Sequence, residues 1–221
     1  MLNNTNMLNP FSTILAILLL PLCCNFAAVQ PMTTNTNATT TTALLLIDIQ
    51  NDYFDGGANP LSGSDAASLN AQKLLARFRA NSLPIVHIQH HATRPGSTFF
   101  VPNTKGAEIH PNVAPLATAT EKLITKHYPN SFRETGLLAH LKTQNITRLV
   151  ICGMMTHVCV DATVRAAKDH GFDITLISDA CATRNLEIQG QPVAAPEVQK
   201  SFLAALAYFY ATVQTTAEYL K

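Results

Sequence analysis

Three side chains of this sequence could together carry out acyl transfer: Asp48, Lys126 and Cys159. A thiol needs a base to remove its proton, a carboxylate beside a lysine can be that base, and a helix N-terminus can stabilise an oxyanion. Taken singly, Asp48 could cap the turn that follows it, and Lys126 could be a solvated lysine. Their joint occurrence at the ends of predicted strands favours a nucleophilic site.

Cys159 lies in GMMTHVCV at 153–160, which leads from a predicted strand into a predicted helix. With Thr156 as the N-cap, Cys159 takes the third helical position, where unpaired N–H groups and the helix dipole favour a thiolate. His157 is not its expected partner, because residues two apart on a helix do not face each other. The five cysteines include no CxxC pair and no zinc-like spacing, so neither a disulfide framework nor a structural zinc site is indicated.

The elements that position these residues alternate between short apolar runs and amphipathic stretches, a pattern typical of βαβ units. The predicted strands are Ala43–Asp48, Pro84–Gln89, Leu123–Lys126, Leu149–Gly153, Ile174–Ser178 and Ala211–Thr215. The predicted helices are Asp65–Ala80, Thr135–Thr143, Thr156–His170 and Ala195–Tyr208. Right-handed crossovers then give an α/β fold, a three-layer α/β/α sandwich around a doubly wound, mainly parallel six-stranded sheet.

In such a sheet, ligands bind beyond the carboxyl ends of the strands, so Asp48, Lys126 and Cys159 can meet at one rim. The segment His90–Thr120 contains several prolines and little helical periodicity. A stretch of that length without regular structure predicts a binding loop or lid. Phe99 and Phe100 within it either anchor the loop to the body or form a wall for the substrate.

The composition predicts one globular domain. The chain has 221 residues, of which 47% are hydrophobic and 13% charged, enough apolar material for one large core. Its formal net charge is +1, and no run of Lys or Arg is visible. Nucleic acid is therefore not an expected partner.

The N-terminal segment is open to three interpretations. Residues 11–22 (FSTILAILLLPL) form an apolar run of signal-peptide length, and the Thr/Asn-rich stretch after it predicts a disordered linker up to residue 42. No Lys or Arg precedes the run, which weakens the interpretation as a signal. An export signal, a membrane tether and a mis-assigned start with Met32 as the first residue stay open. The working prediction is a cytoplasmic domain at 43–221.

Three segments resemble the signature segments of isochorismatase-like hydrolases. They are ALLLIDIQNDYF at 43–54, ITKHYPNSFRETGL at 124–137 and VICGMMTHVCVDATVRAAKDHGFDITLISDACAT at 150–183. Together with FFVPNTKGAEIHPNVAP at 99–115, their wording looks most like the branch that contains streptothricin hydrolase and related amidases. The resemblance covers nearly everything from residue 43 to the C-terminus.

The resemblance implies a catalytic triad of Asp48, Lys126 and Cys159. It also implies an oxyanion hole made of the backbone N–H groups of Met155 and Cys159, with a non-proline cis peptide between Met154 and Met155. The implied reaction cleaves a carbon–nitrogen amide or lactam bond of a small molecule through a thioester. A homo-oligomer, either dimer or tetramer, is implied as well. Candidate substrate-pocket residues are Phe54, Phe99, Phe100 and His157.

Two departures from the wider superfamily shape the prediction. Its nicotinamidases carry an Asp and His metal cluster after the second strand, whereas this chain reads HIQHHATRPG at 87–96. No metal and no cofactor are therefore expected, although the pair His90 and His91 leaves a metal site open. Isochorismatases proper cleave a vinyl ether without a cysteine nucleophile, so Cys159 favours amidase chemistry. The alternatives are an ether or ester hydrolase in which Cys159 is only a pocket wall, and a non-enzymatic thiol sensor.

Overall fold

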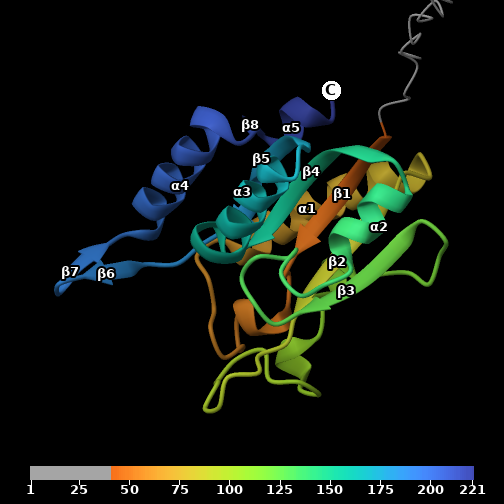
Figure 1. Cartoon of the computed structure of the whole chain (residues 1–221). Coiled ribbons are helices and arrows are strands. Elements are labelled where there is room, and N and C mark those ends of the chain that lie inside the picture. The colour runs from red at the N-terminus through yellow and green to blue at the C-terminus, as the bar shows by residue number, and fades with distance from the viewer. Residues whose placement is uncertain (1–40) are drawn as a thin grey trace, which may run out of the picture. The chain divides into compact units, whose positions relative to one another are not determined.

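Six parallel strands form the central sheet, in the order β3-β2-β1-β4-β5-β8. The computed structural model describes residues 41–221. From β1 in the middle, the chain moves outward through β2 to β3, then crosses back to β4 and continues the other way to β5 and β8 (Figure 1). A reversal of this kind beside β1 defines a doubly wound sheet. The predicted α/β class and six-stranded parallel sheet are confirmed.

All six predicted strands are present, with ends that differ by a few residues. Their bounds are β1 (Thr41–Ile47), β2 (Ile85–His90), β3 (Glu121–Lys126), β4 (Ile146–Met154), β5 (Asp173–Ala182) and β8 (Thr212–Gln214). β5 runs on past Ser178 because Cys181 and Ala182 pair with Gly153 and Met154 after a register shift. The predicted start of the domain at residue 43 is wrong by two residues, since Thr41 and Thr42 already belong to β1.

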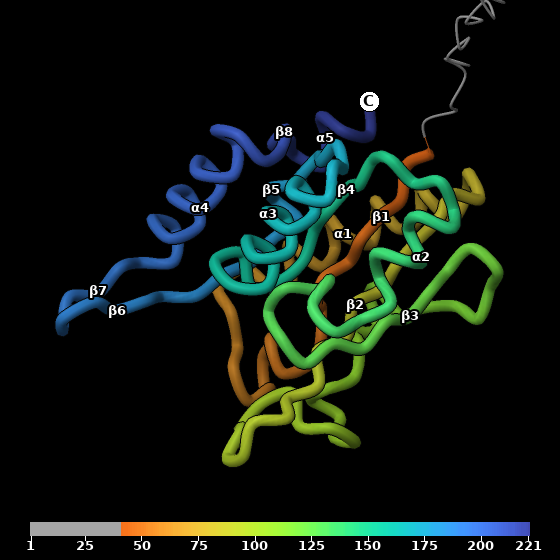
Figure 2. The backbone as a smooth tube through the Cα atoms, viewed as in Figure 1, coloured from red at the N-terminus to blue at the C-terminus, as the bar shows by residue number. Residues whose placement is uncertain are grey.

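Helices cover both faces of the sheet, as Figures 1 and 2 show. α1 (Ser64–Ala80) and the short α5 (Thr216–Tyr219) lie on one face. α2 (Leu137–Thr143) and α3 (Asp161–Asp169) lie on the other, and α4 (Ala195–Phe209) packs beside α3. α1 is helical because small and apolar residues recur every three or four positions and are buried on one side: Ala67, Ala71, Leu74, Leu75 and Phe78. Because helices cover both faces, β1 is a continuous apolar run.

Several elements were not predicted from the sequence. A two-stranded hairpin, β6 (Leu186–Ile188) with β7 (Gln191–Val193), extends away from the sheet between β5 and α4 (Figure 2). The helix predicted over Thr156–His170 is divided into a π-helical turn, η4 (Thr156–Val160), and α3. The segment 90–120 contains two short 3₁₀ helices, η2 (Lys105–Ala107) and η3 (Pro111–Val113). A third, η1 (Asn51–Tyr53), follows β1.

Gly153 lets β4 pass close to β1 just before the site. Its φ is +137°, and a Cβ atom there would overlap the carbonyl oxygen of Ile47. A side chain would therefore be strained by its own backbone and would push β1 away from β4.

Substitution Gly153→Ala is expected to lower the free energy of unfolding by more than about 3 kcal/mol, because backbone strain and overlap with the Ile47 carbonyl act together. Urea denaturation followed by circular dichroism measures this loss. Gly136→Ala is the matched control, since its φ is −81° and a Cβ atom would meet nothing within 4 Å. Equal stability of the two variants would contradict the steric argument.

The predictions for residues 1–40 lie outside the described residues. None of the helices within 41–221 has both the length and the apolar character needed to cross a bilayer. The choice among signal, tether and alternative start, and the expected compartment, stay predictions.

Candidate active site

Four neighbouring strands each deliver one polar group to the same point beyond their carboxyl ends. Lys126 ends β3, His90 ends β2, Asp48 follows β1, and Cys159 follows β4 through η4. The fully buried Lys126 Nζ lies 2.7 Å from Asp48 Oδ2, 2.8 Å from His90 Nδ1 and 3.3 Å from Cys159 Sγ. It also donates to the carbonyl oxygen of Tyr128 at 3.0 Å. The structure thus brings together the three residues singled out from the sequence, around one ammonium group.

Asp48 is held in a restricted conformation at the start of the turn after β1. Its φ is +49°, its N–H donates to the carbonyl of Ile88, and its own carbonyl accepts from Gln50 N–H. Its side chain is fully buried, and Oδ1 has no hydrogen-bond partner among the described residues. Burial raises the pKa of Asp48 above its ordinary value, against the lowering effect of the Lys126 charge. The carboxylate is therefore a better proton acceptor than a solvated aspartate.

Cys159 lies in the π-helical turn η4, and here the structure corrects the sequence prediction. The N-cap is Met155, not Thr156, because the Thr156 hydroxyl donates to the Ala182 carbonyl across the sheet edge. Cys159 is therefore the fourth residue of the turn, not the third. Its side chain is buried, and desolvation together with the Asp48 charge raises its pKa. The resting group is a thiol, since these effects outweigh the helix terminus that was expected to favour a thiolate.

His90 is a further polar group at the site, and it lies one residue beyond the end of the predicted strand. Its Nδ1 lies 2.8 Å from Lys126 Nζ, and its ring lines the same cavity as Cys159. Burial lowers the pKa of His90 to about 3, with the Lys126 charge as the next cause. The imidazole is neutral at physiological pH. The signal was present in the sequence, because His90 stands at the end of β2 as Lys126 stands at the end of β3, paired in register.

A cavity of about 480 Å³ opens beside the Cys159 sulfur. Its wall is mainly aromatic and apolar and includes Tyr53, Phe99, Phe100, Tyr128, Met155 and Val158. Two of the four candidate pocket residues, Phe99 and Phe100, thus line it. The other two do not: Phe54 is buried against the His110 ring at a centroid distance of 3.8 Å, and His157 is bonded to Thr183 and packed near Phe202. Both point away from the cavity because their rings have partners elsewhere.

The segment 90–120 folds back on the body and forms one wall of this cavity. Gln50, fully buried, accepts from His90 N–H and donates to the carbonyls of His90 and Ala107. Asp52 accepts from the Phe100 N–H at 2.6 Å, and the Phe100 ring packs on Tyr53 at a centroid distance of 4.6 Å. Phe100 therefore both anchors the segment and lines the cavity. The sequence predicted only a turn after Asp48, so the roles of Gln50 and Asp52 in anchoring the segment were not predicted.

The segment predicted to form an oxyanion hole borders the same cavity. The peptide bond between Met154 and Met155 is cis. Met155 and Cys159 both line the cavity, and the Met155 carbonyl accepts from the N–H groups of Val158 and Val160. The oxyanion hole made by their N–H groups stays a prediction.

The polar cluster does not fit a divalent metal ion. One ligand atom each from Asp48, His90 and Cys159 lie within 4.8 Å of one another, close enough to be considered as a metal site. The Lys126 ammonium, however, lies within 3.3 Å of an atom of each. A metal would have to displace a buried positive charge that already pairs with the carboxylate. His91 is not part of this cluster.

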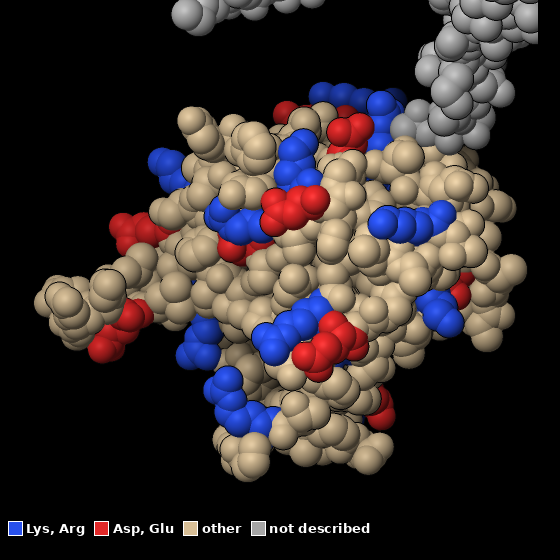
Figure 3. All heavy atoms as spheres, viewed as in Figure 1, with Lys and Arg blue, Asp and Glu red and all other residues tan. Residues whose placement is uncertain are grey.

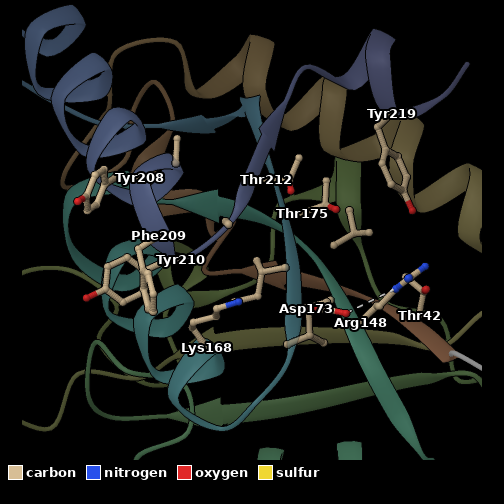
Figure 4. A pocket seen from close by; sticks show the side chains of 15 residues that line it. Thr42, Arg148, Lys168, Asp173, Thr175, Tyr208, Phe209, Tyr210, Thr212 and Tyr219 are labelled. Atoms are coloured by element: carbon tan, nitrogen blue, oxygen red, sulfur yellow. Dashed lines mark ion pairs between the residues drawn. The ribbon is translucent and has the colours of Figure 1, made fainter.

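A second, larger hollow of about 530 Å³ lies near the amino ends of the strands (Figure 4). Its lining includes residues at the starts of three strands: Thr42 of β1, Asp173 of β5 and Thr212 of β8. Tyr208 of α4 also lines it. Arg148 and Asp173 form an exposed ion pair at its edge, with 3.9 Å between the charged atoms. Among the described residues, no cysteine, serine or histidine lines it. It also lies at the end of the sheet where doubly wound folds do not place catalysis.

Charges on the protein surface are mixed in sign. Figure 3 shows basic and acidic side chains interspersed over the face in view. The predictions that nucleic acid is not a partner and that the chain forms an oligomer stay predictions.

The chain is similar to known proteins in both sequence and structure. A family model described as the isochorismatase domain matches residues 42–218. The isochorismatase family protein YddQ of Bacillus subtilis (strain 168), itself uncharacterized, is 49% identical over 181 residues, covering 82% of this chain and 99% of the relative. A streptothricin hydrolase of Streptomyces noursei is 33% identical over 74% of this chain and 55% of that protein. The crystal structure assigned as an isochorismatase hydrolase from Oleispira antarctica superposes with a TM-score of 0.77 at 47% identity, covering 82% of this chain and 96% of that one.

Proposed function

The chain belongs to the isochorismatase family of hydrolases, and from that membership we propose that it hydrolyses a carbon–nitrogen amide or lactam bond of a small molecule. Cys159 is the nucleophile, Asp48 accepts and returns the thiol proton, and Lys126 orients the Asp48 carboxylate and stabilises its negative charge. The streptothricin hydrolase relative supports the choice of bond class. Ether or ester cleavage, and thiol sensing, are the readings this proposal competes with.

The observation that carries the proposal is the shared environment of one carboxylate and one thiol. Asp48 and Cys159 are both buried and both bordered by Lys126 Nζ, at 2.7 Å from Oδ2 and 3.3 Å from Sγ. The unpartnered Oδ1 atom of Asp48 leaves an acceptor free for a proton. A nucleophile with an adjacent base and a third group that orients the base is the arrangement that acyl transfer requires.

The base is assigned to Asp48 and not to His90, although a His90 ring nitrogen is within 4.8 Å of the sulfur. An ammonium group has no lone pair, so His90 Nδ1 must accept from Lys126. A ring with a pKa of about 3 is also a poor proton acceptor near neutral pH. The carboxylate, whose pKa burial raises, is better matched to the task.

The first half of the reaction forms a thioester. Asp48 removes the proton from Cys159 Sγ as the sulfur attacks the amide carbonyl carbon. The N–H groups of Met155 and Cys159 stabilise the oxyanion of the tetrahedral intermediate. The C–N bond then breaks, and Asp48 returns its proton to the departing nitrogen.

The second half restores the enzyme. Asp48 takes a proton from a water molecule, whose oxygen attacks the thioester carbonyl carbon. The C–S bond breaks, a carboxylic acid leaves, and the proton on Asp48 returns to the sulfur. Lys126 stays protonated throughout because the charges of Asp48 and Cys159 outweigh the effect of burial and raise its pKa.

The direct test is ammonia or amine release from a panel of small amides and lactams by the full chain, with intact-mass analysis of quenched samples. Turnover of any member, with an acyl adduct that peptide mapping assigns to Cys159, supports the proposal. Turnover of esters or vinyl ethers without an adduct would favour the competing hydrolase reading.

The pH profile of kcat/KM is expected to fall on the acid side with a midpoint above 3.8, the ordinary pKa of aspartate, because the ionised form of Asp48 is the active one and burial raises its pKa. Activity is then present above this midpoint and lost as the pH falls through it. His90 adds no step near 6.5, since its pKa lies far lower. Initial rates from about pH 3 to about pH 9 measure the profile. A midpoint at or below the ordinary value would show that the Lys126 charge outweighs burial.

A further inference from the structure

One ring nitrogen of His90 is hydrogen-bonded within the site, and the other has no partner among the described residues. Nδ1 accepts a hydrogen bond from the Lys126 ammonium, so the proton of the neutral ring must be on Nε2. The described residues supply no hydrogen-bond partner for Nε2, on a side chain that lines the cavity together with Cys159. The ring therefore presents a fixed N–H donor to whatever occupies the cavity.

The donor is held rigidly. Gln50 Oε1 accepts from His90 N–H at 2.7 Å and Gln50 Nε2 donates to the His90 carbonyl at 3.0 Å, so both backbone groups of His90 are bonded to one buried side chain. The imidazole also packs near the Phe100 ring, at a centroid distance of 5.8 Å. An ammonium that donates to Nδ1 polarises the ring and strengthens Nε2–H as a donor.

An N–H donor without a protein partner, in the same cavity as the Cys159 sulfur, can distinguish substrates by whether they carry a hydrogen-bond acceptor. The cavity wall is mainly apolar and aromatic, with Thr93, Arg94, Ser97 and His127 as its other polar residues. A substrate lacking an acceptor opposite His90 leaves the Nε2–H group unpaired after water is expelled. A substrate with an acceptor at that point pairs with the N–H and avoids this loss of binding free energy, so the site favours it.

We propose that His90 is a specificity-determining residue, which donates Nε2–H to a hydrogen-bond acceptor close to the scissile carbonyl of the substrate. This inference rests on the proposed amidase function. The substrate class it defines is a small amide or lactam that carries a hydrogen-bond acceptor within reach of His90 while its carbonyl lies at Cys159.

A pair of ring amides of equal shape tests the proposal. Picolinamide has a ring nitrogen beside the amide-bearing carbon, and benzamide has a C–H there. In His90→Leu, kcat/KM for picolinamide is expected to fall about tenfold to 100-fold more than kcat/KM for benzamide. His90→Gln, which keeps an N–H donor near the Nε2 position, is expected to restore part of the preference. An equal fall for both amides would assign His90 a structural role only and overturn the proposal.

A second readout does not depend on turnover. Two-bond ¹H–¹⁵N correlation spectra of the full chain, with His90 assigned by its absence in His90→Gln, are expected to show a neutral ring protonated at Nε2 at about pH 6. A ring protonated at Nδ1 or at both nitrogens would overturn the proposal even if no amide is hydrolysed. No release from any amide, combined with the expected ring state, would instead count against the amidase function alone.

Discussion

Cys159→Ala is expected to lower amide turnover by about ten-thousand-fold or more, the largest effect of any single change proposed for this protein. Without the sulfur, no thioester forms, and neither Asp48 nor the oxyanion donors can replace a covalent intermediate. The measurement is kcat and kcat/KM for the best amide of the panel, with intact mass after quenching to show that the acyl adduct is lost.

Cys152→Ala is the matched control, because Cys152 is also buried but lies inside β4, away from the cavity. Its turnover is expected to stay close to that of the unchanged protein. Hydrolysis that survives in Cys159→Ala but is lost in Asp48→Asn would move the assignment to an ether or ester hydrolase. The thiol-sensor interpretation instead predicts that alkylation of Cys159 is unchanged in Asp48→Asn, whereas the proposed mechanism predicts slower alkylation.

The sheet could be predicted because its strands carry a strong signal. β1 and β4 each contain an unbroken buried run, ALLLI at 43–47 and LVICGM at 149–154, as strands covered on both faces do. The hairpin of β6 and β7 could not be predicted, since its residues are exposed or half-buried and form only a short antiparallel pair. Short exposed strands of this kind carry no periodicity that distinguishes them from a loop.

The proximity of the three candidate catalytic residues, Asp48, Lys126 and Cys159, could be predicted because each lies at or beyond the carboxyl end of a strand, and these ends meet at one edge of the sheet. The structure adds what depends on long-range contacts. His90 and Gln50 acquire their roles from bonds that join residues 40 positions apart in the chain. Phe54 and His157 were misplaced because the direction of a ring depends on partners such as His110 and Thr183, which sequence spacing does not reveal.

Asp48→Asn is expected to lower kcat by about 100-fold to 10,000-fold, since an amide cannot accept the thiol proton. It also leaves the Lys126 ammonium buried without its counter-charge, at a cost of about 3–5 kcal/mol in the free energy of unfolding. Kinetics and urea denaturation measure the two losses. An exposed pair serves as control: Asp173→Asn, which removes the partner of Arg148, is expected to change stability by less than about 1 kcal/mol.

The double variant Asp48→Asn with Lys126→Met separates the two losses. Removing both charges eliminates the uncompensated ammonium, so stability is expected to return most of the way to that of the unchanged protein. Turnover is expected to stay as low as in Asp48→Asn, because the proton acceptor is still missing. Recovery of stability without recovery of activity would show that the buried pair is kept for proton transfer and not for folding. If activity returned together with stability, Asp48 would be a structural partner of Lys126, and the thiol would have to lose its proton to another group.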